Sequence, residues 1–473
     1  MRKYTYLLTA GVIVAGLLLA ACAAPTPEIV EVEVTRVVTE KEEVEVPVEV
    51  PVEVPVEVTP TSPPKEPVNL KIWIRSGSWY EHYQVIVDEW NAAHPDIQVI
   101  MESIPAAQST EEAIITAVAT GTQPDMVDGM LMNMGSLLGE YGAAVPLDSF
   151  PDFWDVVDST HRRSPIESTL WRDHAYVMPE YMASLMMIWN VDLLEAAGAT
   201  EPPRTYGEFL DLAANLKAAE PDKYALGMIT KPDWYYRWGD FFMFYAAASE
   251  GGSFLESATD DNGNPVTVVS LDNEPATKVA EFVATLAEEE YSPLEYLTTD
   301  SFYQGNVMAS FDTGYWTPRF VEETYPDFNY AMTLPLVPDD YPADEPVWTD
   351  GFVKGMLMFS SCEHQEEAWE FMKFVFNDEY DMDLLTTVSA PPARIDVTTN
   401  PVFTEAIEAF PPAFKDCIGA FEYTAAYPVH PKHMDLWETF SELAWEPLAT
   451  GRKAPDVALS DAKSKMESIL AKP

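Results

Sequence analysis

The feature that most limits the fold of this chain is the change of pattern at Val68. From there, short apolar runs alternate with amphipathic segments. Residues 69–77 (NLKIWIRSG) are rich in β-branched and aromatic residues and end in turn residues, which predicts a buried strand. Apolar residues then recur at helical spacing from Tyr80 to His94. The same order continues with a strand at 97–104, a helix at 110–120 and a strand at 125–129. Strands and helices that alternate at short spacing predict a parallel α/β sheet.

The rest of the chain supplies more helices and is too long for a single core. With 473 residues, of which 47% are hydrophobic, the composition is globular and the length predicts two lobes. The acid-rich segment 259–273 reads as a hairpin around Asn262-Gly263, and it lacks the ligand spacing of an EF-hand. Further amphipathic helices are predicted at 206–219, 276–290, 363–377 and 454–470.

Charge excludes one class of partner. The chain has 78 acidic and 27 basic residues, a net charge of −51, and most of the excess lies after residue 66. Nucleic acid would be repelled, so we expect no nucleic-acid binding. Attraction to an anionic lipid surface is unfavourable for the same reason.

The N-terminal segment has the pattern of a secretory signal. Arg2 and Lys3 precede an apolar run from Tyr6 to Leu19, which is shorter than the roughly 20 residues that span a bilayer. The run ends in Leu19-Ala20-Ala21-Cys22, which resembles a bacterial lipobox. We therefore expect residues 1–21 to be removed and Cys22 to be lipidated. Several acyl chains on Cys22 would hold the protein on the outside of the cell membrane.

A low-complexity segment, 22–67, follows the lipidation site. Its Val/Glu alternation would favour a strand, but Pro47, Pro51 and Pro55 recur at every fourth position and remove backbone donors. Ten glutamates between Glu28 and Glu57 also repel one another. We expect an extended tether, about 3.1 Å long per residue.

The order of the segments after Val68 is similar to that of the bacterial extracellular solute-binding proteins of the maltose-binding, family 1 type, which are substrate receptors of ABC importers. The similarity is carried by six segments: LKIWIRSGSWYEHYQVIVDEWNAAHPDIQV, ATGTQPDMV, LMMIWNVDLLEAAGATEPPRTYGEFLDLAANL, NVMASFDTGYW, HQEEAWEFMKFVFN and GRKAPDVALSDAKSKMESIL. Together they extend from about Val68 to Leu470.

This resemblance implies a two-lobed α/β periplasmic-binding-protein type II fold, with a hinge and an interlobe cleft. Residues 68–180 plus 347–388 would form the first lobe, and 181–346 plus 389–473 the second. The implied function is that of a monomeric, non-catalytic receptor that binds a sugar or oligosaccharide in the cleft. It would need no cofactor and would deliver the ligand to the permease subunits of an ABC transporter.

Sugars present apolar ring faces edged by hydroxyl groups, so their sites combine aromatic surfaces with planar polar groups. Arg75 and Ser78 correspond to polar positions of the family, and Trp79 follows from its place on a loop at the carboxyl edge of the sheet. The run 233–238 is the densest aromatic segment, although a buried helix would explain it equally well. The aromatic candidates are Trp234, Tyr235, Trp238, Tyr315, Trp316 and Trp437.

The polar candidates are chosen by their position beside strand ends or the expected crossings between lobes, since most acids of this chain are solvated surface groups. They are Asp128, Glu180, Tyr181, Asp312 and Asp350. By contrast, we interpret Arg394 as structural.

Cys362 and Cys417 are the thiols left after lipidation. Because an exported location permits a bridge, we expect a disulfide between them. We predict no metal site: His430 and His433 lie three residues apart, but the neighbouring prolines disfavour a helical face.

Two alternative functions stay open. A surface-anchored glycoside hydrolase would also use acids in an aromatic cleft, although no nucleophile or metal motif is present. Within the receptor class, the same scaffold binds polyamines, glycerol phosphates and other solutes. A structural or adhesive lipoprotein would show repeats of 20–50 residues, and the sequence has none outside the tether.

Overall fold

The computed structural model describes residues 67–472, apart from 108, 229, 231–236, 260–264, 296, 426 and 428. These residues belong to one compact unit, Pro64–Pro473. The predicted signal peptide, Cys22 and the tether lie outside the described residues. Within the described ranges, no helix has both the length and the apolar character needed to cross a bilayer.

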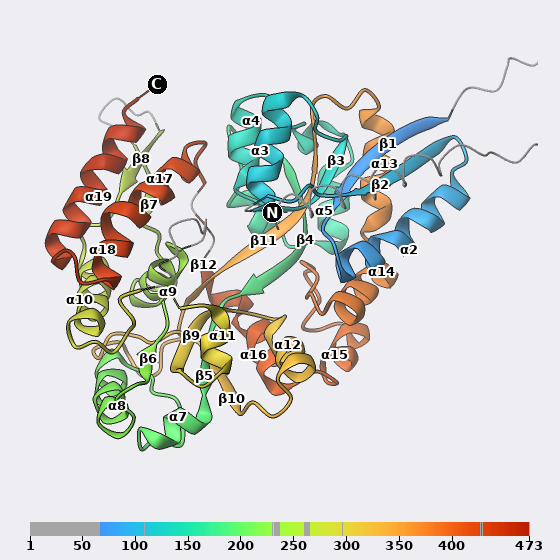
Figure 1. The fold of residues 1–473 in the computed structure, drawn as a ribbon. Helices are drawn as coiled ribbons and strands as arrows, with labels where there is room; N and C mark the ends of the chain where they lie inside the picture. Colours follow the sequence, from blue (N-terminus) through green and yellow to red (C-terminus); the bar gives the residue numbers. More distant parts are fainter. Residues whose placement is uncertain are drawn as a thin grey trace, which may run out of the picture. The chain divides into compact units, whose positions relative to one another are not determined.

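The first sheet has the strand order β12-β11-β3-β1-β2, with β4 also paired to β11 (Figure 1). Its strands are β1 (Val68–Ile74), β2 (Ile97–Ser103), β3 (Met126–Leu131), β4 (Val177–Ser184), β11 (Thr349–Met358) and β12 (Thr424–Ala425). β1 runs parallel to β2 and β3, which confirms the parallel pairing predicted for the N-terminal segments. β11 is antiparallel to both β3 and β4.

Helices follow the strands of this sheet where the sequence predicts them. α2 (Ser78–Ala93) and α3 (Thr110–Thr120) match the predicted helices within two residues. α2 buries Tyr83, Ile86, Val87 and Trp90, the apolar stripe read from the sequence. The other helices before the second sheet are α4 (Met134–Glu140), α5 (Phe153–Thr160) and α6 (Arg163–Glu167).

The second sheet has the order β10-β5-β9-β6. It consists of β5 (Met186–Asn190), β6 (Tyr224–Leu226), β9 (Val307–Thr313) and β10 (Tyr330–Thr333), and β7 (Leu255–Thr259) forms a separate hairpin with β8 (Pro265–Val269). The predicted later helices are present as α8 (Tyr206–Ala219), α10 (Glu274–Glu288), α13 (Gln365–Val375) and α19 (Pro455–Leu470).

Side-chain caps mark the starts of several helices. Thr205 and Glu208 form a capping box at the start of α8, and Asn273 caps α10. The remaining helices are α7 (Val191–Ala196), α9 (Gly239–Ala248), α11 (Thr299–Tyr303), α12 (Thr317–Thr324), α14 (Asp378–Asp383), α15 (Pro401–Ile407), α16 (Pro412–Gly419), α17 (His433–Phe440) and α18 (Glu446–Ala449), with π-helical turns at Leu384–Val388 and Ser441–Trp445.

β4 and β11 connect the two sheets. β4 ends at Ser184 and β5 begins at Met186, so the chain leaves the first sheet at Leu185. β11 lies antiparallel beside β4 along its length (Figure 1). At Gly351 a Cβ atom would lie 2.1 Å from the carbonyl oxygen of Ala183, so only glycine permits this approach. The predicted boundary at 180/181 falls inside β4, and the division of the chain into lobes stays a prediction.

The predicted disulfide between Cys362 and Cys417 is wrong, because both thiols are free and buried. Cys362 packs in the main core beside the end of β11, whereas Cys417 packs with Met186 and Ile188 of the second sheet. Burial raises the pKa of each thiol to about 12, so both are unreactive thiols at neutral pH.

Candidate functional site

Arg75 follows β1 and lies across β3. Its Nε and Nη2 donate to Oδ2 of Asp128 at 3.1 and 3.0 Å, and its Nη1 donates to the Tyr181 hydroxyl at 2.6 Å. Nη2 also lies 3.9 Å from a carboxyl oxygen of Glu180. Gly129 adopts a φ of +78°, and a Cβ there would lie 2.4 Å from Nε of Arg75. The absence of a side chain at Gly129 therefore leaves room for the guanidinium against the sheet.

Aromatic rings from separate segments surround this guanidinium. Its carbon lies 3.3 Å from the ring centroid of Trp79, and Trp79 lies 4.7 Å from Tyr181. Tyr181 contacts Tyr315 edge-on at 5.9 Å, and Tyr315 contacts Trp316 at 5.1 Å. We name this group the arginine cluster, and its members are Arg75, Trp79, Asp128, Glu180, Tyr181, Tyr315 and Trp316. The structure thus brings together predicted residues that are far apart in sequence.

Two buried carboxyl groups lie near the guanidinium in the arginine cluster. Glu180 is 3% exposed and accepts a hydrogen bond from the Tyr83 hydroxyl at 2.6 Å. Burial, together with the neighbouring charge of Asp128, raises the pKa of Glu180 well above its ordinary value. Although burial acts to lower it, the pKa of Arg75 is raised by the charge of Asp128. Arg75 and Asp128 therefore form an ion pair inside the cluster.

Replacing Glu180 with glutamine should flatten the pH dependence of stability. The folded pKa of Glu180 lies above the unfolded value of about 4.3, so its stabilising contribution is complete below that pH and is lost as the pH rises. Glutamine keeps an acceptor for Tyr83 without titrating. Urea unfolding at several pH values should show E180Q gaining on the parent by up to about 1.4 kcal/mol per pH unit above pH 5. A constant difference between the two proteins from pH 5 to 8 would contradict the raised pKa of Glu180.

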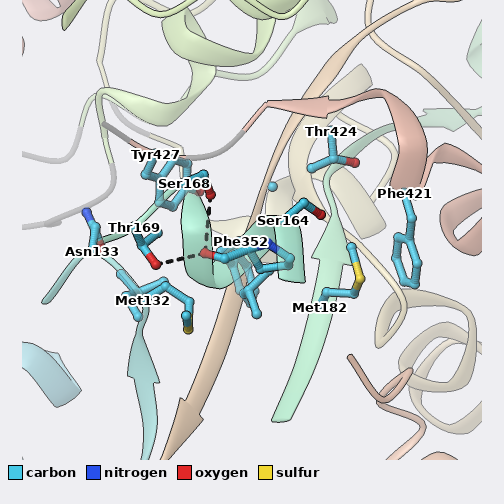
Figure 2. A pocket seen from close by; sticks show the side chains of 14 residues that line it. Met132, Asn133, Ser164, Ser168, Thr169, Met182, Phe352, Phe421, Thr424 and Tyr427 are labelled. Carbon is cyan, nitrogen blue, oxygen red and sulfur yellow. Dashed lines mark hydrogen bonds between the residues drawn. The ribbon is translucent and has the colours of Figure 1, made fainter. Parts of the chain in front are cut away.

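A cavity of about 250 Å³ lies beside the arginine cluster (Figure 2). Its walls come from the end of β3, from α6 and the turn after it, from β4 and β11, and from the segment around β12. Phe352 belongs to this wall and also stacks on Trp316 at 6.3 Å, so it separates the cavity from the arginine cluster. The lining residues are Leu131, Met132, Asn133, Ser164, Pro165, Ser168, Thr169, Met182, Gly351, Phe352, Val353, Phe421, Thr424 and Tyr427.

None of these described lining residues is Asp, Glu, Lys, Arg or His. The polar groups are hydroxyls and one side-chain amide, and the apolar groups include the rings of Phe352, Phe421 and Tyr427. Figure 2 shows the hydroxyls of Ser168 and Thr169 directed at one oxygen atom, the carbonyl oxygen of Pro165, to which they donate at 3.2 and 2.7 Å. Rings beside uncharged hydrogen-bonding groups suit a neutral ligand with apolar faces and hydroxyl edges.

Short contacts tie the cavity walls to the crossing strands. The backbone N–H of Met132 donates to the carbonyl of Val353 at 3.1 Å. The hydroxyls of Ser184 and Thr424 are 2.6 Å apart, and β12 pairs with the start of β11. A change in the angle between β4 and β11 would therefore move the cavity walls.

The remaining predicted residues lie elsewhere. Trp238 and Trp437 are fully buried and stack on each other at 4.2 Å behind Tyr427, where a ligand has no access to either ring. Asp350 is fully buried and accepts a hydrogen bond from Tyr427 at 3.5 Å. Ser78 is the half-buried first residue of α2. The backbone of Asp312 lies in β9, whereas its side chain, Trp234 and Tyr235 lie outside the described part.

Among the predicted site residues whose side chains the structure describes, none lines the cavity itself. Asn133 and Phe352 lie a few residues after the predicted Asp128 and Asp350, so a wider search of strand ends would have found them. No sequence pattern indicates the lining side chains on α6 and around β12, because their position at the cavity depends on contacts between distant segments.

Comparison with known proteins identifies the family. Residues 76–382 match the model of the bacterial extracellular solute-binding proteins. The chain belongs to this family. The solute-binding protein is 22% identical over 325 residues to the maltotriose-binding protein of Pyrococcus abyssi (strain GE5 / Orsay), which covers 67% of this chain and 65% of that protein.

Solved structures agree with this assignment. An uncharacterized protein of Listeria monocytogenes EGD-e has a TM-score of 0.72 and 28% identity, over 85% of this chain and all of that chain. The cyclic alpha-maltosyl-1,6-maltose binding protein of Arthrobacter globiformis has a TM-score of 0.70 and 17% identity, over 85% of this chain and 99% of that one. The prediction of a two-lobed α/β periplasmic-binding-protein fold is confirmed.

Proposed function

We propose that this solute-binding protein binds a neutral sugar or oligosaccharide at the cavity beside β4 and β11 and delivers it to an ABC permease. The observation that carries the proposal is the cavity wall, in which aromatic rings alternate with hydroxyl and amide groups and the described lining residues include no charged side chain. The carbohydrate ligands named for the Pyrococcus and Arthrobacter relatives support the same ligand class.

The charges near the cavity disfavour the other solutes. A polyamine needs uncompensated carboxylates and a glycerol phosphate needs cations. The nearby cation Arg75 is paired with Asp128, and Lys354 lies 3.6 Å from Glu111, both of them outside the cavity wall. A charged ligand in this cavity would lose its hydration without gaining a counterion.

The carboxyl groups also fit a receptor better than a hydrolase. A glycoside hydrolase holds two carboxyl groups on either side of the bond to be broken. Asp128 and Glu180 are buried and engaged by Arg75 and Tyr83, and neither lines the cavity. Membership in a family of solute-binding proteins likewise favours a receptor that binds its ligand without converting it.

Release would follow from motion at the crossing strands. A ligand that contacts cavity walls on both sides of the crossing strands β4 and β11 binds best when these walls are close together. Its binding therefore shifts the population toward the arrangement with the walls close together. Outside the cell, lipid on Cys22 would keep the receptor near its permease, which the Leu19-Ala20-Ala21-Cys22 pattern supports.

A thermal-shift panel on residues 67–473 tests the proposal. Neutral mono- and oligosaccharides should raise the melting temperature, whereas spermidine and glycerol 3-phosphate should not. At a ligand concentration 100 times Kd the stabilisation should be about 2.7 kcal/mol. Stabilisation by spermidine or glycerol 3-phosphate alone, or chemical cleavage of a bound oligosaccharide, would contradict it.

Phe352→Ala should weaken binding of the active carbohydrate by at least about tenfold, because the ring forms a cavity wall. Phe320→Ala is the matched control, since Phe320 is 41% exposed on α12 and lines no part of the cavity. Isothermal titration of both variants measures the difference. Equal affinities in the two variants would remove the cavity from the binding site.

A further inference from the structure

Two hydroxyl groups of the cavity wall, at the turn after α6, have their protons directed into the protein. Thr169 Oγ1 lies 2.7 Å from the carbonyl oxygen of Pro165 and 3.1 Å from that of Ile166. Ser168 Oγ lies 3.2 Å from the same Pro165 oxygen (Figure 2). A carbonyl oxygen only accepts hydrogen bonds, so both hydroxyls are the donors. Each of them therefore keeps only lone pairs for a ligand.

The wall around β12 has the same polarity. Thr424 Oγ1 donates to the carbonyl oxygen of Ala420 at 2.9 Å, so the 2.6 Å contact between the hydroxyls of Thr424 and Ser184 is donated by Ser184. The Tyr427 hydroxyl donates to a carboxyl oxygen of Asp350 at 3.5 Å. Thr424 and Tyr427 therefore also present lone pairs to the cavity.

The other polar side chains of the described wall supply few donors. They are the amide of Asn133, which carries donors and acceptors, and the exposed hydroxyl of Ser164. The thioethers of Met132 and Met182 are weak acceptors and donate no hydrogen bond. None of the described lining residues is Lys, Arg or His, so the wall has no charged donor. The cavity wall is thus rich in acceptors.

An acceptor-rich wall distinguishes ligands by their donors. A sugar hydroxyl can turn its proton toward Thr169 or Thr424. An ether or ester oxygen at the same place has no proton, so two sets of lone pairs would face each other. A buried acceptor that loses its donor weakens binding by about tenfold or more. The wall therefore favours free hydroxyl groups over substituted ones.

We infer that the protein selects its carbohydrate through hydrogen bonds that the ligand donates to Thr169 and Thr424, so that it binds free sugars and rejects their O-methylated or O-acetylated forms. The inference rests on the proposed function and adds to it the form of the carbohydrate. Thr169 is the main specificity-determining residue of the turn after α6, because two carbonyls hold its proton and its side chain is less exposed than that of Ser168.

Fluorinated sugars test this inference, because fluorine replaces a hydroxyl at similar size but has no proton to donate. Glucose, galactose, mannose, xylose, maltose and cellobiose are screened by thermal shift. The sugar with the largest shift is then titrated together with its deoxy and deoxyfluoro analogues. At one or more positions, the deoxyfluoro analogue should bind at least about tenfold more weakly than the parent sugar and within about threefold of the deoxy analogue.

The outcomes separate this inference from the proposed function. Deoxyfluoro analogues that bind as tightly as the parent sugar at every position would overturn the inference and leave the proposed function intact. Equal binding of the O-methylated sugars would do the same. If no neutral carbohydrate bound at all, both would be overturned.

Replacing Thr169 with valine locates the discrimination, since valine keeps the branched shape and lacks the hydroxyl. Thr169→Val should bind the parent sugar about tenfold more weakly but the discriminated deoxyfluoro analogue within about twofold of the unmutated protein. Thr169→Ser should retain the discrimination. Thr285→Val is the matched control, because the Thr285 hydroxyl also donates to a backbone carbonyl, that of Glu281 at 2.8 Å, and lines no part of the cavity. Undiminished discrimination in Thr169→Val, or its loss in Thr285→Val, would overturn the role of Thr169.

Discussion

Replacing Arg75 with methionine is expected to lower the free energy of unfolding by about 3–5 kcal/mol at pH 7. Asp128 is fully buried, and Arg75 supplies its charge partner at 3.0 Å. Methionine would fill much of the space but would leave a buried carboxylate without its cation. Urea denaturation monitored by tryptophan fluorescence measures the loss.

Arg163→Met is the matched control for this variant. Arg163 also pairs with an aspartate, Asp158, but both side chains are about half exposed. An exposed ion pair contributes at most about 1 kcal/mol, so this control should change stability little. Equal effects of the two substitutions would refute the buried pair.

Replacing Arg394 with methionine should cost a similar amount of stability, about 3–5 kcal/mol, without changing ligand affinity in the folded protein. Arg394 pairs with Asp378, Asp381 and Asp396 at 2.8, 2.7 and 2.9 Å. Next to it, the backbone N–H of Ala393 donates to the carbonyl of Glu180 at 2.8 Å. The arginine therefore anchors the segment that supports β4.

Asp381→Asn separates the charge effect from the packing effect. Burial raises the pKa of Asp381 to about 7, despite the opposing effect of Arg394. Because this lies above the unfolded value of about 3.9, the stabilising contribution of Asp381 is present at low pH and is lost toward pH 7. Asp381→Asn should thus lose little stability at pH 7, and much less than Arg394→Met. A more than tenfold change in carbohydrate affinity in Arg394→Met, measured below its melting temperature, would show a binding role.

The elements that the sequence predicts well are those fixed by local patterns. β1 and α2 follow each other closely in the sequence. The regular spacing of the apolar residues in each element identifies it. Each of the residues Arg75, Asp128 and Tyr181 lies in a strand of the first sheet or directly after one. Residues at these positions are neighbours in an α/β fold, so the three side chains come together.

The errors arise where the answer depends on distant contacts. Trp238 and Trp437 have the composition of a sugar-binding surface, but they stack on each other in the core. Composition cannot distinguish these two uses of a ring. The two-residue strand β12 has no periodicity, yet it brings Thr424 and Tyr427 to the cavity. Likewise, Cys362 and Cys417 pack in different apolar clusters, which no spacing along the chain reveals.

A crystal structure with the carbohydrate that gives the largest thermal shift is the most direct test of the binding site. We predict an intact sugar ring in contact with Phe352 and within hydrogen-bond distance of Asn133 or Thr169, with no charged side chain touching that ring. A ligand bound outside the cavity walled by Phe352, or one cleaved by the protein, would contradict the proposed neutral-carbohydrate receptor.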